Sequence, residues 1–237
     1  MKKPQKERCY LCLKEFDTKV MTDDHAPPKC IYPPGTPDRI YARACGPCNR
    51  SFMDDDNEFR NWLSTVASSS KSKKWIFDNK TVSSLKKDKR LLHNIQSRLS
   101  VGDVDLGGGE IARLPKCGYP ADRTQAMFRR ITKCLLTRFY PSYDYSNDAF
   151  LIGHMLLEEP QHRFAFWQTI APLLIDHRGE DVFVFWRGVV DDGAVKNLAG
   201  VWVLLFYPDA DLKGACFSVI HSHHQLFKTR LVTRGAP

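Results

Sequence analysis

Two pairs of cysteines near the N-terminus have the spacing of a metal site. They are the Cys-x-x-Cys pairs Cys9/Cys12 and Cys45/Cys48. Zn²⁺ favours a tetrahedron of deprotonated cysteines, and one Cys-x-x-Cys turn supplies two of the four ligands. We therefore expect a structural zinc ion on these four residues, in preference to disulfide bonds or a redox motif.

Three polar residues beside these cysteines suggest a reaction. Asp24-His25 lies between the pairs, and Asn49 follows Cys48 directly. Mg²⁺ or Mn²⁺ binds oxygen ligands, and an aspartate carboxylate with an asparagine carbonyl supplies two. A histidine with the ordinary pKa of about 6.5 accepts a proton near neutral pH. Together, Asp24, Asn49 and His25 indicate metal-assisted hydrolysis of a phosphodiester.

An acidic run, Asp54-Asp55-Asp56, follows a few residues later. One of these carboxylates is a candidate third ligand for the catalytic cation, and we select Asp55. The alternative is that the acids lie near a helix N-terminus because the helix dipole favours negative charge there.

These strings resemble the HNH, or ββα-metal, endonucleases that carry a zinc-knuckle pair. The resemblance covers residues 9–62 and rests on Cys9-Tyr-Leu-Cys12, Asp24-His25-Ala-Pro-Pro28 and Cys45-Gly-Pro-Cys48-Asn49. A similar branch includes phage Holliday-junction resolvases and bacterial restriction and defence nucleases. The resemblance implies that Asp24 and Asn49 bind the divalent cation, that His25 activates the attacking water, and that DNA is the substrate.

The chain departs from the family at one position. The family has a central asparagine in its second strand, and no asparagine lies between His25 and Cys45. Asp38 is the nearest polar candidate. The departure leaves the cation ligands and the base in place.

The elements that must position these residues indicate an α+β fold. We expect a zinc-stabilised ββα domain over residues 1–66, in which the prolines between the knuckles exclude a long helix. Residues 38–44 alternate as a short strand does, and the pattern after Cys48 is helical, with Phe52, Phe59, Trp62, Leu63 and Val66 on one face.

Residues 67–110 are expected to form a basic linker or helical segment. Residues 67–74 have the composition of a linker, 85–99 that of a basic amphipathic helix, and 107–109 that of a glycine loop. The segment from Lys71 to Arg98 contains nine basic residues and only two acidic ones, Asp78 and Asp88. The run is either a solvated segment or a surface that contacts phosphates.

Residues 111–237 are expected to form a mixed domain that binds or selects the substrate. The periodicity predicts a helix over 122–139, antiparallel strands over 182–187, 201–207 and 215–221, and a helical stretch over 147–175. The histidines at 221, 223 and 224 suggest a surface cluster without function.

The whole composition favours a polyanionic partner. Net charge is +8 and the pI is about 9.1, which fits nucleic acid, with double-stranded DNA as our expectation. No apolar run is long enough for a membrane span. The basic first residues lack the apolar segment of a signal peptide, so we expect a cytoplasmic protein. A homodimer would supply two sites for cutting both strands.

Two alternatives to an endonuclease remain open. One is a non-catalytic zinc module that binds nucleic acid and carries a degenerate Asp-His pair. The other makes the C-terminal region the functional centre, as a sensor or protein-interaction domain. Dependence of DNA cleavage on a divalent cation separates the first alternative from the enzyme.

Overall fold

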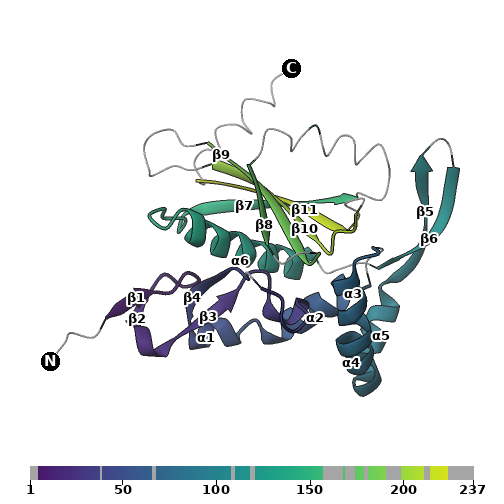
Figure 1. Cartoon of the computed structure of the whole chain (residues 1–237), viewed down its shortest axis with the longest axis horizontal. Coiled ribbons are helices and arrows are strands. Elements are labelled where there is room, and N and C mark those ends of the chain that lie inside the picture. Colours follow the sequence, from purple (N-terminus) through teal and green to yellow (C-terminus); the bar gives the residue numbers. More distant parts are fainter. Residues whose placement is uncertain are drawn as a thin grey trace.

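The protein has an α+β fold, as the sequence predicts (Figure 1). The computed structural model describes residues 5–37, 39–65, 68–107, 110–117, 121–156, 168, 174–178, 181–190, 199–210 and 214–223. Within these residues no helix is both long enough and apolar enough to cross a bilayer. Asp38 and Val66, which the sequence singles out, lie outside the described residues.

The N-terminal unit consists of two hairpins followed by two helices. Its elements are β1 (Lys6–Arg8), β2 (Glu15–Asp17), the 3-10 turn η1 (Thr18–Val20), β3 (Met21–His25), the 3-10 turn η2 (Lys29–Ile31), β4 (Tyr41–Cys45), α1 (Gly46–Arg50) and α2 (Met53–Leu63). β3 pairs antiparallel with β4, so that Met21 lies opposite Cys45 and His25 opposite Tyr41. The hairpin and the following helices form the expected ββα order.

The basic segment after this unit is helical from Lys71 onward. It contains α3 (Lys71–Ile76), the π-helical turn η3 (Phe77–Thr81), α4 (Val82–Lys87) and α5 (Lys89–Ser97). The expected linker over 67–74 is therefore wrong in its second half. The Ser70 hydroxyl caps α3 by accepting from the Lys73 N–H at 3.1 Å, and it donates to the Asp181 carboxylate at 2.9 Å. The composition of the serine run 68–70 suggests a flexible segment, but its last residue is the N-cap of a helix.

The expected helix over 85–99 is two helices. Asp88 has an extended backbone (φ −122°, ψ 97°) and ends α4. Its carboxylate accepts from the N–H groups of Arg90 and Leu91 and so caps α5. The cap compensates for the break in the helix, because the aspartate accepts from two N–H groups that have lost the carbonyl partners they would have in a continuous helix.

A two-stranded ribbon, β5 (Leu99–Gly107) with β6 (Glu110–Cys117), projects from the body next to α5 (Figure 1). The body beyond it consists of one long helix and one sheet. The helix, α6 (Ala121–Phe139), confirms the prediction over 122–139. The sheet has the order β7-β11-β10-β9-β8 with antiparallel neighbours.

The strands of this sheet are β7 (Asp148–Leu156), β8 (Leu174–Arg178), β9 (Phe183–Val190), β10 (Ala199–Phe206) and β11 (Ala215–His223). The three strands predicted near the C-terminus are confirmed as β9, β10 and β11. The helix predicted over 147–175 is wrong where the structure describes it, since β7 and β8 are strands. In β7 Phe150 is buried and Leu151 is 54% exposed, the alternation of a half-buried strand.

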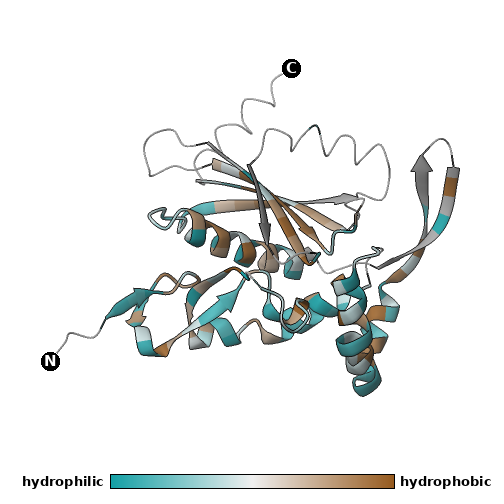
Figure 2. Ribbon diagram, viewed as in Figure 1, coloured by the Kyte–Doolittle hydropathy of each residue, from teal (hydrophilic) through white to brown (hydrophobic). Residues whose placement is uncertain are grey.

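α6 lies between the sheet and the N-terminal unit (Figure 1). On the sheet side, the Phe128 ring centroid is 4.0 Å from that of Phe217 and 5.8 Å from that of Phe206. Phe59 of α2 packs edge-on against Phe128 at 5.7 Å. One apolar core therefore runs from the cysteine-bearing turns to the sheet, and Figure 2 shows apolar residues concentrated on the central strands and along α6.

Candidate functional site

The four cysteines of the two knuckles meet at one point. Cys9 and Cys12 lie on the turn between β1 and β2, Cys45 ends β4, and Cys48 lies in α1. All four sulfur atoms lie within 4.8 Å of one another, and the Sγ atoms of Cys12 and Cys45 are 4.0 Å apart. Zinc–sulfur bonds of about 2.3 Å in a tetrahedron require sulfur atoms roughly 3.8 Å apart. The cluster therefore fits a metal ion such as Zn²⁺.

The environment of the sulfur atoms also suits a cation. Burial acts to raise the pKa of Cys9, but hydrogen bonds from the N–H groups of Cys12, Cys45 and Leu11 outweigh it and lower that pKa. Burial raises the pKa of Cys12 and of Cys48, and their sulfur neighbours contribute. Four thiolates so close together need a bound cation to stay deprotonated. When bound, zinc would supply that charge and hold the hairpins and α1 together.

Asp24 points away from solvent, toward α6. Its exposed fraction is 2%. The Tyr10 hydroxyl donates to Oδ2 of Asp24 at 2.6 Å, and the Arg130 Nε donates to the same oxygen at 3.0 Å. The Nη2 group of Arg130 donates to the other oxygen, Oδ1. Both carboxylate oxygens are thus engaged by side chains from the β1–β2 turn and α6.

Arg130 also binds Asp56, which lies in the first turn of α2. Its Nη1 donates to Oδ1 of Asp56, and its Nη2 lies 3.4 Å from Oδ2. The guanidinium carbon lies 4.5 Å from the centroid of the Phe52 ring. Burial raises the pKa of Asp56 to about 6, against the opposing effect of Arg130 and with a contribution from Asp24. Two carboxylates therefore share one buried cationic group, with Asp24 2% and Asp56 21% exposed.

The Asn49 side chain contacts β3 at Thr22 and Asp23, the two residues that precede Asp24. Its amide donates to the Thr22 hydroxyl at 3.0 Å and lies 3.4 Å from the Asp23 carbonyl. Thr22 and Asp24 are two residues apart on β3 and share one face of the strand. Asn49 and Asp24 therefore lie along the same side of the hairpin, and no hydrogen bond joins them in the described structure. Their joint role as cation ligands stays a prediction.

His25 ends β3 and is half-buried. Its ring centroid lies 6.1 Å from that of Tyr41, its partner across the hairpin. Burial lowers the pKa of His25, and the positive charges of Arg39 and Lys29 lower it further. An imidazole in this environment is neutral at neutral pH and can accept a proton, which suits the predicted base.

Three acidic residues of α2 form ion pairs with arginines from outside that helix. Asp55 lies 3.5 Å from Nη1 of Arg123, and Glu58 forms ion pairs with Arg98 and Arg123. Asp56 is the member that shares Arg130 with Asp24. The structure thus brings together Asp24 and Asp56, whereas the sequence selects Asp55 as the additional ligand.

Comparisons with known proteins identify no relative. No family model, no curated protein and no solved structure matches the chain. The resemblance to HNH endonucleases rests on the residues and spacings of the N-terminal unit.

Sequence reasoning missed Arg130. Arg130 lies three residues after Met127 and four before Cys134, both of which are buried, so it falls inside the buried arc of α6. An arginine at such a position must pair with buried acids, because an unpaired buried charge is strongly destabilising. The position of Arg130 between the buried Met127 and Cys134 is the sequence signal that could have predicted a carboxylate partner.

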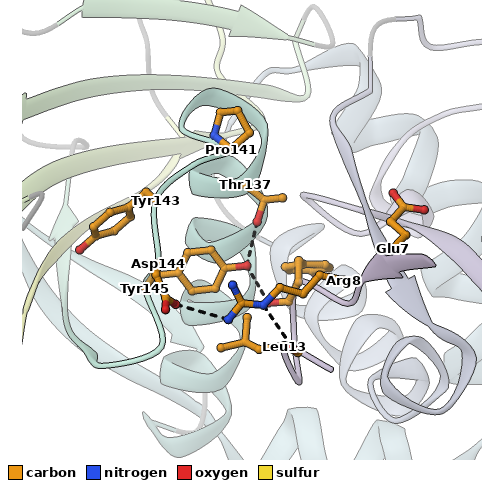
Figure 3. A pocket seen from close by; sticks show the side chains of 9 residues that line it. Glu7, Arg8, Leu13, Thr137, Pro141, Tyr143, Asp144 and Tyr145 are labelled. Carbon is orange, nitrogen blue, oxygen red and sulfur yellow. Dashed lines mark hydrogen bonds and ion pairs between the residues drawn. The ribbon is translucent and has the colours of Figure 1, made fainter. Parts of the chain in front are cut away.

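A cavity of about 220 Å³ lies between the N-terminal unit and the end of α6 (Figure 3). Arg8 is one of the lining residues and donates to the Leu13 carbonyl and to the Asp144 carboxylate. The Tyr145 hydroxyl lies 2.8 Å from both the Thr137 hydroxyl and the Tyr10 carbonyl. The predicted site residues are not among the described residues that line it.

His221 is not part of a surface cluster. It is fully buried, and its Nδ1 lies 3.1 Å from Oδ2 of Asp148. The Tyr143 hydroxyl lies 2.8 Å from each oxygen of that carboxylate. A Cβ atom at Gly200 would lie only 2.4 Å from Nε2 of His221, so the histidine fills a space that a larger residue at 200 would occupy.

Proposed function

We propose that the protein is a metal-dependent HNH-type endonuclease that hydrolyses phosphodiester bonds in DNA. The observation that supports this most is the ββα order of β3, β4 and the α1–α2 pair, with the cysteine cluster at its base. This arrangement carries His25 at the end of β3, with Asp24 and Asn49 along one side of the hairpin. A divalent cation there would neutralise charge on the phosphoryl group, and His25 would take the proton of the attacking water.

DNA as the substrate is supported by the distribution of positive charge. The chain has a net charge of +8, and Lys86, Lys87, Lys89 and Arg90 are exposed at the junction of α4 and α5. Exposed lysines that neutralise phosphates release counterions and so strengthen binding at low salt. A role in bacterial restriction or defence is part of the same proposal, because such nucleases share the motif.

The test is cleavage of supercoiled plasmid by the purified, zinc-loaded chain. Reactions contain Mg²⁺, Mn²⁺ or no added divalent cation, and zinc content is measured in each sample. We expect nicked or linear product only with Mg²⁺ or Mn²⁺. Intact plasmid and intact short duplexes in all three conditions, with zinc still bound, would contradict the enzyme.

The basic junction of α4 and α5 gives a prediction for binding. The triple variant Lys86→Gln, Lys87→Gln, Lys89→Gln should weaken duplex binding. The slope of log affinity against log salt should fall by about one for each of these lysines that neutralises a phosphate in the wild type. Fluorescence anisotropy over a salt series measures this slope.

The control for the basic junction carries Lys6→Gln, Lys14→Gln and Lys19→Gln, three exposed lysines of the knuckle region. It changes the net charge of the chain by the same amount, so it separates a local DNA surface from a general effect of charge. Equal weakening of duplex binding in both triple variants would argue against a local DNA surface at α4 and α5.

The second candidate function is a non-catalytic zinc module that binds nucleic acid. The observation in its favour is that Arg130 and Tyr10 already engage both oxygens of Asp24. This candidate predicts salt-dependent DNA binding with no cleavage in any divalent cation. The plasmid assay and the anisotropy series together separate the two candidates.

A further inference from the structure

The β5–β6 ribbon has an apolar face that the rest of the described structure leaves exposed. The ribbon projects from the body, and within the described residues its sheet has only these two strands (Figure 1). Leu99 is 50% exposed, Val101 64% and Ile111 68%. Nine large apolar side chains are exposed among the described residues, and three of them are on this ribbon. A two-stranded ribbon is only marginally stable alone in water, so such a concentration of exposed apolar groups indicates a partner.

The three apolar side chains share their face with one acid and one base. Residues two apart on a strand lie on the same face, and so do residues directly opposite each other on paired strands. Asp103 lies opposite Arg113, and both side chains are exposed, with Oδ1 and Nε 3.4 Å apart. The face therefore runs from Leu99 and Val101 at the base of the ribbon, through the pair Asp103–Arg113, to Ile111 toward the tip.

The charge of the ribbon argues against DNA as its partner. Residues 99–117 contain three acidic and two basic residues, so the ribbon has a net charge of −1 in a chain of net charge +8. Phosphates are bound by an excess of positive charge, which this ribbon lacks. The partner of this face must be apolar at two places and carry an acid and a base between them. A second copy of the chain has this pattern.

A two-fold axis along the ribbon makes the face complementary to itself. In a symmetric dimer, a contact from one residue to another is repeated in the opposite direction. With the axis along the ribbon, β5 of each copy lies over β6 of the other. Asp103 of one copy then meets the partner's Arg113, and the same ion pair forms a second time with the roles reversed. The apolar side chains on either side exclude water from the two pairs and so reduce their screening.

We propose that the exposed face of the β5–β6 ribbon is the interface through which two copies of this chain associate. The proposal assigns Leu99, Val101 and Ile111 as the apolar contacts, and Asp103 and Arg113 as the charges that fix the orientation. Association itself does not depend on the proposed function. Only its use, which is to present one catalytic hairpin to each strand of a duplex, rests on the nuclease.

The test is the mass of the zinc-loaded full chain in sedimentation velocity, without DNA. We expect a dimer at about 100 µM, a concentration at which a Kd in the micromolar range leaves few monomers. Ile111→Asp places an unpaired charge on the apolar face and should raise the dimer Kd at least about tenfold. The control is Val20→Asp, at a 56% exposed apolar residue of η1, which should associate as the wild type does. A monomeric wild type at this concentration would overturn the inference, as would an Ile111→Asp dimer of wild-type stability.

The charged pair gives a test that does not rely on loss of association alone. Asp103→Arg leaves two bases on the face and Arg113→Asp leaves two acids, so neither variant should associate with itself. A mixture of the two should form a heterodimer, which native mass spectrometry identifies from its mass. The double variant Asp103→Arg, Arg113→Asp should dimerise as the wild type does. Recovery in the mixture would also show that the ribbon is folded in both single variants, and failure of both recoveries would overturn the inference.

Duplex binding and plasmid cleavage are measured separately on the wild type and Ile111→Asp. Loss of duplex binding in an Ile111→Asp chain of unchanged mass would identify DNA as the occupant of the face and overturn the dimer. A ribbon-dependent dimer that leaves plasmid intact in every divalent cation would contradict the nuclease and leave the interface standing.

Discussion

The His25→Ala variant is expected to cleave DNA about 10²–10⁴-fold more slowly than the wild type, which is the usual contribution of a general base. The side chain is half-buried at the end of β3, and burial with the nearby charges of Arg39 and Lys29 lowers its pKa. A neutral imidazole is the form that can take a proton from water. Its removal leaves cation binding unchanged, so that only the activation of water is lost. The measurement is the initial rate of plasmid nicking at saturating Mg²⁺.

The control for this variant is His93→Ala, an exposed histidine on α5. It should nick plasmid at the wild-type rate. Zinc content and thermal unfolding of His25→Ala should match the wild type, because no hydrogen bond of the described residues joins His25 to any of the four cysteines. Undiminished nicking by His25→Ala would exclude it as the base and direct attention to other groups near the hairpin.

The second large effect concerns the cysteine cluster. Cys48→Ser removes one of four thiolates, and we expect it to lose the metal and about 4 kcal/mol of stability, which is at the large end of single-substitution effects and within the class that loss of a metal produces. For a chain of this size that loss corresponds to a fall in Tm of roughly 8–16 °C. The cause is local, since the β1–β2 turn, the end of β4 and α1 meet at these sulfur atoms. Differential scanning calorimetry with metal analysis measures both quantities.

Cys30→Ser is the matched control for the cluster. The Cys30 thiol donates to the Asp56 carbonyl at 3.2 Å and lies outside the cluster, and a serine hydroxyl can make the same bond. Its metal content should equal that of the wild type. A strong chelator should reproduce the Tm of Cys48→Ser in the wild type and leave Cys48→Ser itself unchanged. Retention of one metal ion per chain in Cys48→Ser would argue against the four-cysteine site.

The sequence predicts those parts of the structure that depend on residues close together in the chain. The cysteine spacing is local, and the four sulfur atoms meet as expected. β9, β10 and β11 are rich in valine and aromatic residues, and α6 has a regular apolar stripe, so both types of element could be predicted. Ser70 and Asp88 escape prediction because each caps a helix, and a cap depends on where the neighbouring chain turns.

The contacts that decide the candidate site come from residues far apart in the chain. Arg130 meets Asp24 across 106 positions and Asp56 across 74. Neither spacing has a periodicity that a single sequence reveals. The pairing of Asp56, and not Asp55, with Arg130 has the same origin, because it depends on the position of α6.

The packing of α6 on both sides limits how the site can change. Phe128 holds the helix to the sheet, and Cys134 and Arg130 face the hairpin. A shift of the whole helix would disrupt two interfaces at once, whereas rotation about the side-chain bonds of a single arginine disrupts neither. A change in the pairing of Asp24 is therefore expected to involve the Arg130 side chain alone and to leave the backbone framework of the protein in place.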